Sequence, residues 1–194
     1  MEIEDNKITM CLTQQVKEFL ARSTKTSGAI LDKLAEGGTR YVKNHILMHP
    51  RMLLKTLIKL SKDKDRKIRK IVAEHPNTPV EVLEKLAQDE DYNVKVKVAF
   101  NPNTPSELLK KMVENEYEGS YIRYAITQNK NIPVETLVKL AEDKNKDVRQ
   151  GVAWNGNTPD DILEKLVNDK DWYVAKDAWR TKRAKFEARE RKNK

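Results

Sequence analysis

The chain has 194 residues, with 35% charged residues, 6% aromatic residues and a formal net charge of +8. It holds no apolar run near the roughly 20 residues of a membrane span, and its first residues, MEIEDNKITM, are acidic where a signal peptide is basic. The single cysteine, Cys11, excludes an internal disulfide framework and a multi-cysteine metal cluster built within this chain. These features predict a cytoplasmic domain without a membrane segment.

A sequence of about 26 residues repeats along most of the chain. The prolines that begin its second half are 26, 28 and 26 residues apart, and the leucines that follow keep the same spacing. Two weaker copies precede them, since stepping back from Leu83 by 26 residues reaches Leu57 and then Leu31. Repeats of this length stack so that each buries its neighbour's apolar face. The repeats are predicted to begin at Val16, Val42, Ile68, Val94, Ile122 and Val148.

In chain order, residues 1–15 show no period and are predicted to be a lead-in, and residues 16–173 form the repeats. The first repeat departs from the pattern at Gly28, as expected of a terminal repeat with one face toward solvent. The two extra residues of the fourth repeat fall near 116–119, where a loop can hold them.

Each repeat is predicted to contain two helices. The first segment spans about seven residues and is short enough to take 3₁₀ geometry. The second begins at Thr-Pro, and we expect Thr78 to be its N-cap, Pro79 its first helical residue and Glu81 the partner that completes a capping box. The fifth repeat has Ile132 in place of this threonine, which predicts a looser turn.

The repeat motif stands as VKVKVAFNPNTPSELLKKM at residues 94–112 and as VRQGVAWNGNTPDDILEKL at residues 148–166. This motif resembles the leucine-rich repeat variant family, and the resemblance covers residues 16–173. It implies an all-α fold, a right-handed α-solenoid of about six two-helix repeats in which one helix is often 3₁₀. Some relatives carry a cysteine-ligated iron–sulfur module before the repeats, which one cysteine cannot supply. The resemblance therefore implies a fold and no chemistry.

The positive charge lies mainly at the C-terminal end. Between Val174 and Lys194 there are nine Lys or Arg and three Asp or Glu, a net of +6, whereas residues 1–173 carry 29 basic and 27 acidic residues, a net of +2. The segment 174–194 has no break after its first turns, so we expect a basic capping helix and tail. The residues expected to cover the last repeat are Val174, Ala178 and Trp179.

Two ladders of basic residues recur at fixed positions. The first follows acidic loops that can pair with it between repeats, and the second has an acid four residues earlier in the later repeats, which favours ion pairs along a solvated helix. The first ladder is Lys17, Lys43, Arg69, Lys95, Arg123 and Arg149. The second is Lys33, Lys59, Lys85, Lys111, Lys139 and Lys165, with acids at Glu81, Glu107, Glu135 and Asp161.

The third, fourth and seventh positions of the first segment vary between repeats and face away from its apolar pair. Aromatic residues recur there, and an exposed apolar patch is costly without a partner. The alternative is that these rings pack against neighbouring turns. The sequence favours a non-catalytic scaffold, a monomer that binds a protein partner along this surface. The predicted contact residues are Phe100, Tyr124, Gln128, Trp154 and Lys97.

The rival interpretation is a nucleic-acid-binding repeat protein that uses the basic tail and ladders. Its contact residues would be Arg180, Lys182, Arg183, Arg149 and Arg123. A third, weaker interpretation is a helical-repeat DNA glycosylase, suggested by Asp177-Ala178-Trp179-Arg180 in the tail.

Catalytic, metal and cofactor sites have little support in the sequence. Among the histidines, His49 and His75 occupy the position of Asn101 in later repeats, which suggests a hydrogen bond that stabilises the turn. His45 is the third histidine, and no further zinc ligand recurs nearby. No glycine-rich phosphate loop, nucleophile elbow or paired-carboxylate motif is visible. We expect no enzymatic activity, no cofactor and no metal.

Overall fold

The computed structural model describes residues 12–114 and 119–192. Most of the predicted lead-in, Cys11 and all but one residue of the insertion at 116–119 lie outside the described residues. The described chain holds thirteen α-helices and no strand, which confirms the predicted all-α helical-repeat fold. No described helix is both long and apolar enough to cross a membrane. The chain divides into an N-terminal block, Met1–Asn103, and a C-terminal block, Thr104–Lys194.

Each repeat contributes a first and a second helix. The first helices are α2 (Gln14–Arg22), α4 (Arg40–Leu47), α6 (Arg66–Glu74), α8 (Tyr92–Phe100), α10 (Ser120–Thr127) and α12 (Lys146–Trp154). The second helices are α3 (Gly28–Gly37), α5 (Leu54–Leu60), α7 (Val80–Leu86), α9 (Ser106–Glu114), α11 (Val134–Leu140) and α13 (Asp160–Leu166). The chain continues as one 21-residue helix, α14 (Trp172–Lys192). The first helices are α-helical over eight or nine residues, so the 3₁₀ geometry considered for them is not found.

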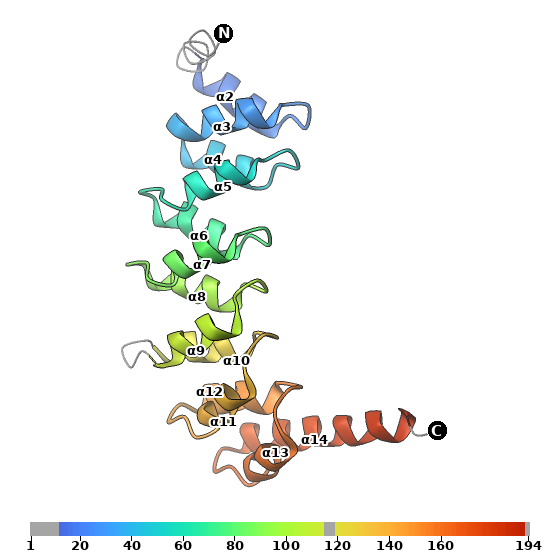
Figure 1. The fold of residues 1–194 in the computed structure, drawn as a ribbon. Coiled ribbons are helices and arrows are strands. Elements are labelled where there is room, and N and C mark those ends of the chain that lie inside the picture. The colour runs from blue at the N-terminus through green and yellow to red at the C-terminus, as the bar shows by residue number, and fades with distance from the viewer. Residues whose placement is uncertain (1–11, 115–118, 193–194) are drawn as a thin grey trace. The chain divides into compact units, whose positions relative to one another are not determined.

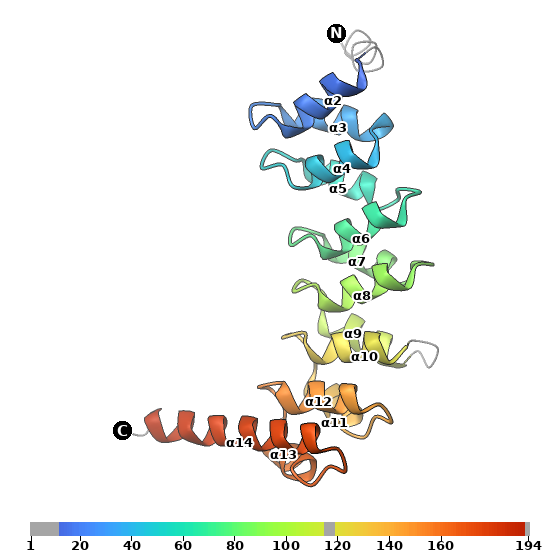
Figure 2. The same cartoon turned by 180° about the vertical axis from the view of Figure 1, so that it is seen from behind.

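The core is made by the periodic apolar residues, because one repeat cannot bury them alone. Val148 and Val152 of α12 and Leu163 of α13 have no exposed surface. Successive first helices pack against each other within each block: α6 against α8 in the N-terminal block, and α12 against both α10 and α14 in the C-terminal block. Figures 1 and 2 show these helix pairs stacked in chain order within each block.

The Thr-Pro turn is built differently from the prediction. Pro79, not Thr78, is the N-cap of α7, with extended backbone angles of −64° and 152°, and no side chain caps the helix. The Thr78 hydroxyl instead donates a 2.5 Å hydrogen bond to the carbonyl of Val72 in α6. Thr158 makes the equivalent 2.6 Å bond to the carbonyl of Val152. The capping-box prediction was wrong because the threonine lies one residue too early, where its hydroxyl reaches back to the preceding helix.

The fifth repeat shows that this threonine is not needed to start the second helix. Pro133 is the N-cap of α11 with backbone angles of −66° and 148°, nearly those of Pro79. Ile132 is buried, with 4% of its surface exposed, so it replaces the hydroxyl bond by apolar packing. The expectation of a looser turn was therefore wrong.

Within each block, a ladder of hydrogen bonds joins the turn of one repeat to the repeat before it. In the N-terminal block, Asn101 donates from Nδ2 to the carbonyl of Ala73 at 2.7 Å and accepts the Asn103 backbone N–H at 2.9 Å. His75 occupies the same position, accepts the Asn77 backbone N–H at 3.1 Å and bonds to the backbone of Leu47. The turn-stabilising role predicted for this histidine is confirmed. Burial lowers the pKa of His75.

Replacing His75 with asparagine is expected to flatten the pH dependence of stability near neutrality. The pKa of His75 is lowered in the folded protein. Its contribution to the free energy of unfolding is therefore present above the unfolded pKa of about 6.5 and is lost as the pH falls through the folded pKa. Asparagine can make both bonds, as Asn101 does, and carries no proton. Urea unfolding followed by circular dichroism at pH values of about 7.5 and 5.5 measures the effect.

The control is His45→Asn, because the ring of His45 packs edge-on against Tyr41 at 4.5 Å and lies outside the ladder. His45→Asn should keep the loss of stability on acidification that His75→Asn reduces. Equal pH dependence in the wild type and His75→Asn would show that His75 does not carry the effect.

Candidate functional site

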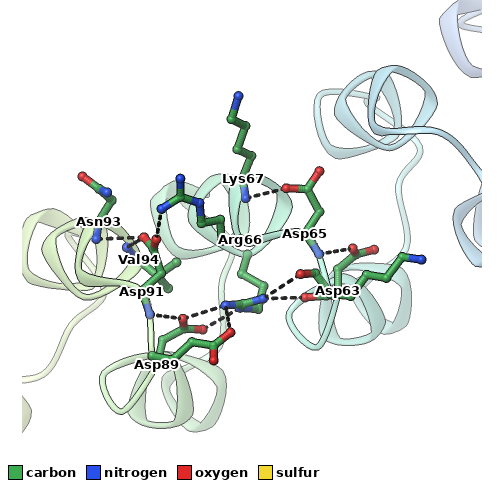
Figure 3. Close-up of polar contacts among 11 residues, drawn as sticks. Asp63, Asp65, Arg66, Lys67, Asp89, Asp91, Asn93 and Val94 are labelled. Atoms are coloured by element: carbon green, nitrogen blue, oxygen red, sulfur yellow. Dashed lines mark hydrogen bonds and ion pairs between the residues drawn. The ribbon is translucent and has the colours of Figure 1, made fainter.

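A buried arginine holds two successive loops together in the N-terminal block. Arg69 of α6 donates from Nε and Nη2 to the two carboxylate oxygens of Asp89, at 2.7 and 2.9 Å. Its Nη1 also donates to the backbone carbonyl of Asp63 at 2.9 Å. Since Asp63 precedes α6 and Asp89 precedes α8, this one side chain joins the loops of consecutive repeats. Figure 3 shows the two aspartates on these loops.

The same clamp recurs along the first basic ladder. In the C-terminal block, Arg149 donates to both carboxylate oxygens of Asp169 at 2.7 and 2.9 Å and to the carbonyl of Asp143 at 2.9 Å. Burial alone would raise the pKa of Asp89, but hydrogen bonds from Arg69 and from the Asp91 backbone hold that pKa below its ordinary value. The predicted pairing of this ladder with the acidic loops is confirmed for Lys43, Arg69, Arg123 and Arg149.

A second set of aspartates caps the first helices and pairs with the repeat before. The carboxylate of Asp91 accepts the backbone N–H of Asn93 at 2.9 Å and so caps α8 (Figure 3). Arg66, at the start of α6, lies 2.8 Å from the same carboxylate. These contacts fix the spacing of neighbouring helices and leave the carboxylates occupied.

The residues of the nucleic-acid interpretation are all engaged in ion pairs. The side chains of Arg149 and Arg123 are only 7% and 15% exposed. The five pairs are Arg123 with Asp143, Arg149 with Asp169, Arg180 with Asp177, Lys182 with Glu164, and Arg183 with Glu187. Binding phosphate there would require existing ion pairs to be exchanged.

The second ladder does not form the expected pairs along its own helices. Within the described side chains, none of Lys85, Lys111, Lys139 and Lys165 lies within 4.0 Å of the acid four residues earlier. Glu135 instead lies 3.9 Å from Lys110 of the preceding repeat. These exposed lysines extend into solvent, where pairing gains little free energy.

In the C-terminal block, the predicted partner-binding residues lie on two neighbouring helices. Tyr124 and Gln128 are one turn apart on and after α10, and Trp154 ends α12 with 54% of its surface exposed. Gln150 of α12 donates to the carboxylate of Asp177 in α14 at 2.7 Å. We call the surface formed by Tyr124, Gln128, Gln150 and Trp154 the α10–α12 face.

Gly151 lets α10 and α12 approach closely beneath this face. A Cβ atom built at Gly151 would lie 2.0 Å from Oγ1 and 3.0 Å from Cβ of Thr127. Thr127 is fully buried, and its hydroxyl donates to the carbonyl of Tyr124 at 2.7 Å. The absence of a side chain at this position therefore sets the separation of the two helices that carry the face.

Two hollows open at opposite ends of the α10–α12 face. One, of about 390 Å³, includes Tyr121, Tyr124 and Gln150 in its wall, and the two tyrosine rings are stacked with centroids 6.0 Å apart. The other, of about 320 Å³, lies beside Trp154 and is lined by Gln128 and Asn157 among other polar groups. An aromatic ring beside amide side chains can hold an apolar group and hydrogen-bond a peptide backbone.

The other two predicted contact residues, Phe100 and Lys97, belong to the N-terminal block. Phe100 ends α8 and is 37% exposed, less than Trp154. The ammonium group of Lys97 lies 2.7 Å from Glu74 of α6. This lysine joins two first helices of consecutive repeats, which is a structural role.

Sequence reasoning missed several surface residues. Asn157 lies in the hollow beside Trp154 although it was assigned only to the turn motif, and Tyr121 completes the tyrosine stack.

Trp179, predicted to cover the core, is 52% exposed, whereas Val174 and Ala178 are buried as expected. Trp179 takes the position of Ala153, which is buried one repeat earlier.

The described side chains contain no group of three His, Cys, Asp or Glu residues arranged to hold a metal ion. His49 bonds to the carbonyl of Ser23 at 3.0 Å and accepts the Arg51 backbone N–H at 3.0 Å. Its Nε2 thus joins its turn to the preceding repeat, and its Nδ1 holds the turn of its own repeat.

Comparison with known proteins agrees with the fold. A family model described as leucine rich repeat variant matches residues 66–91. A solved structure described as a leucine-rich repeat variant with a novel repetitive structural motif is 28% identical, with a TM-score of 0.62, over 80% of this chain and 62% of that chain. The chain thus spans less than two thirds of that protein's length.

Two further solved structures are less similar. An engineered protein is 20% identical, with a TM-score of 0.36, over 93% of this chain and 95% of its own. A designed armadillo repeat protein is 16% identical, with a TM-score of 0.38, over 88% of this chain and 92% of its own. No curated protein sequence matches significantly. The family match and the first structure confirm the resemblance to the leucine-rich repeat variant family.

Proposed function

We propose that this chain, a helical-repeat protein of the leucine-rich repeat variant type, is a binding scaffold that holds an extended segment of a partner protein on its α10–α12 face. The observation that carries the proposal is Trp154, an indole 54% exposed on the wall of a polar hollow. Tryptophan in such a place is the residue most often found to dominate binding energy at protein interfaces.

The chemistry of the hollow favours a peptide. An apolar side chain of the segment would stack on Trp154, while the amide oxygens of Gln128 and Asn157 would accept its backbone N–H groups. Their amide nitrogens already donate to Oγ1 of Thr127 at 3.1 Å and to the carbonyl of Lys130 at 3.3 Å. Tyr124, in the wall of the hollow at the other end of the face, would contact a residue further along the segment. Of the five cations of the rival nucleic-acid interpretation, Arg123 and Arg149 are held in largely buried pairs with loop aspartates. A phosphate could therefore reach only the exposed cations of α14, which makes nucleic acid the less favoured ligand.

Replacing Trp154 with alanine is expected to weaken peptide binding at least tenfold, or about 1.4 kcal/mol. The probe is a peptide selected from a displayed library of random dodecapeptides on the full chain. Its dissociation constant is then measured by isothermal titration calorimetry. The matched control is Tyr173→Ala, because Tyr173 is 57% exposed on α14, outside the face.

Selected peptides that bind Trp154→Ala as tightly as the wild type would contradict the proposal. So would a library that yields no binder while a random-sequence DNA duplex binds with steep salt dependence. Circular dichroism of both variants checks that the helices are retained.

A further inference from the structure

The last helix carries a second surface, outside the α10–α12 face. Trp172, Trp179 and Phe186 follow one another at intervals of seven residues along α14, so they lie on one side of the helix. They are 64%, 52% and 62% exposed. The opposite side of α14 is buried through Val174 and Ala178 against α12 and α13. We call the exposed side, with Lys176 and Arg183, the α14 face.

The α14 face corresponds to the side of α12 that contacts α14. In α12, Gln150 reaches across to Asp177 of α14. One repeat later the position of Gln150 is taken by Lys176, and that of Ala153 by Trp179. The side with which α12 holds its neighbour is therefore exposed on α14, and it carries an indole instead of a methyl group. Figures 1 and 2 show α14 extending past α13 within the C-terminal block.

Cations border the aromatic rings. The ammonium of Lys176 lies 4.6 Å from the ring centre of Trp172, and the guanidinium of Arg183 lies 5.4 Å from that of Trp179. The described helix has eight Lys or Arg and three Asp or Glu, a net of +5. An apolar centre with a basic rim is complementary to an apolar stripe with an acidic rim.

We propose that the α14 face docks an acidic amphipathic helix of a partner protein. Three residues at intervals of seven repeat about every 10.5 Å along α14, which matches the apolar heptads of another helix. A second copy of the chain would place one net charge of +5 against another, which is unfavourable.

The size of the face predicts a transient complex. A fully buried aromatic side chain removes about 150–250 Å² from water, so covering what is exposed of these three would bury on the order of 300–400 Å² on this side. Counting both partners, the interface is below the roughly 1,200 Å² of stable complexes. We therefore expect a dissociation constant in the micromolar range.

The test uses the full chain and a synthetic helical peptide as long as α14, with leucine at its heptad positions and glutamate on the flanks. Binding is measured by fluorescence anisotropy. Trp179→Ala should weaken binding about tenfold or more, while Trp154→Ala should leave it unchanged. The double variant Lys176→Glu, Arg183→Glu should lose the acidic peptide and bind a matched peptide with lysine flanks.

Equal binding of the acidic and basic peptides to the wild type, or full binding by Trp179→Ala, would overturn the proposal. So would binding to vesicles of equimolar phosphatidylcholine and phosphatidylserine that is tighter than binding to the acidic peptide. Self-association in sedimentation velocity that Trp179→Ala abolishes would assign the face to a second copy instead. Because the library peptide is tested at Trp154 and the acidic helix at Trp179, the two proposals fail independently.

Discussion

Replacing Gly151 with alanine is expected to lower the free energy of unfolding by about 1–3 kcal/mol, because the added methyl group overpacks a closed interface. Alanine favours a helix over glycine by about 1 kcal/mol, which opposes the loss. The steric term wins because the new Cβ would lie 2.0 Å from Oγ1 of Thr127 and 3.0 Å from its Cβ. Rotation of the threonine relieves only the first contact, so α10 and α12 must move apart.

Urea unfolding followed by tryptophan fluorescence measures this change, since all three tryptophans belong to the C-terminal block. Gly156→Ala is the matched control, because a Cβ there meets no atom within 4 Å. Removing the hydroxyl with Thr127→Ala in the Gly151→Ala background should recover part of the stability. A Gly151→Ala protein as stable as Gly156→Ala would mean that the helices do not depend on this close approach.

Replacing Arg149 with methionine is expected to cost about 3–5 kcal/mol, since it leaves a buried carboxylate without its counter-charge. The side chains of Arg149 and Asp169 are only 7% and 9% exposed. Arg149→Lys should cost less, because an ammonium can reach one carboxylate, as Lys43 reaches Asp63 at 2.6 Å. Lysine cannot also bind the carbonyl of Asp143, which Arg149 holds at 2.9 Å.

The matched control is Lys146→Met, which removes a 57% exposed ammonium 3.4 Å from Asp171. Exposed pairs contribute about 0–1 kcal/mol, so this variant should remain close to the wild type in urea unfolding. Equal losses for Arg149→Met and Lys146→Met would remove the distinction between a buried clamp and a surface pair. The Arg149 guanidinium holds the pKa of Asp169 below its ordinary value, so the clamp's contribution should be lost only as the pH falls below about 4.

The repeat fold could be predicted because its signals are local and periodic. The spacing of the prolines and leucines placed both helices of each repeat, and the valines of the first segments are buried as expected. The equivalence of His75 and Asn101 identified the ladder that joins turns, because both side chains offer a donor and an acceptor at similar reach. The pairing of Arg69 with an acidic loop followed from the charge pattern.

The errors concern choices between neighbouring partners. The Thr78 hydroxyl could bond to the amides that begin the following helix or to the carbonyl of Val72 in the preceding helix. It bonds to Val72, and no side chain caps α7. Glu135 had lysines available in its own helix and in the preceding repeat, and it lies near Lys110. Trp179 is exposed because α14 packs against α12 and α13 through its opposite side, which the buried position of Ala153 in the repeat pattern does not predict.

The predicted binding surface is also only partly gathered within one block. The variable positions predict a continuous stripe that includes Phe100 and Trp154. The structure brings Tyr124, Gln128 and Trp154 together on two packed helices of one block, with a hollow beside the indole. Lys97 is occupied by Glu74, a pairing between repeats that the pattern of a single repeat does not contain.

The most direct test of a peptide-binding scaffold is to locate a selected dodecapeptide on the isotopically labelled chain by amide and indole NMR shifts. Binding at the α10–α12 face predicts the largest shifts at the Trp154 indole, the Gln128 side-chain amide and the backbone of residues 155–157. Shifts concentrated on α11 and α13, around Lys139 and Lys165, with an unperturbed Trp154 indole, would contradict it.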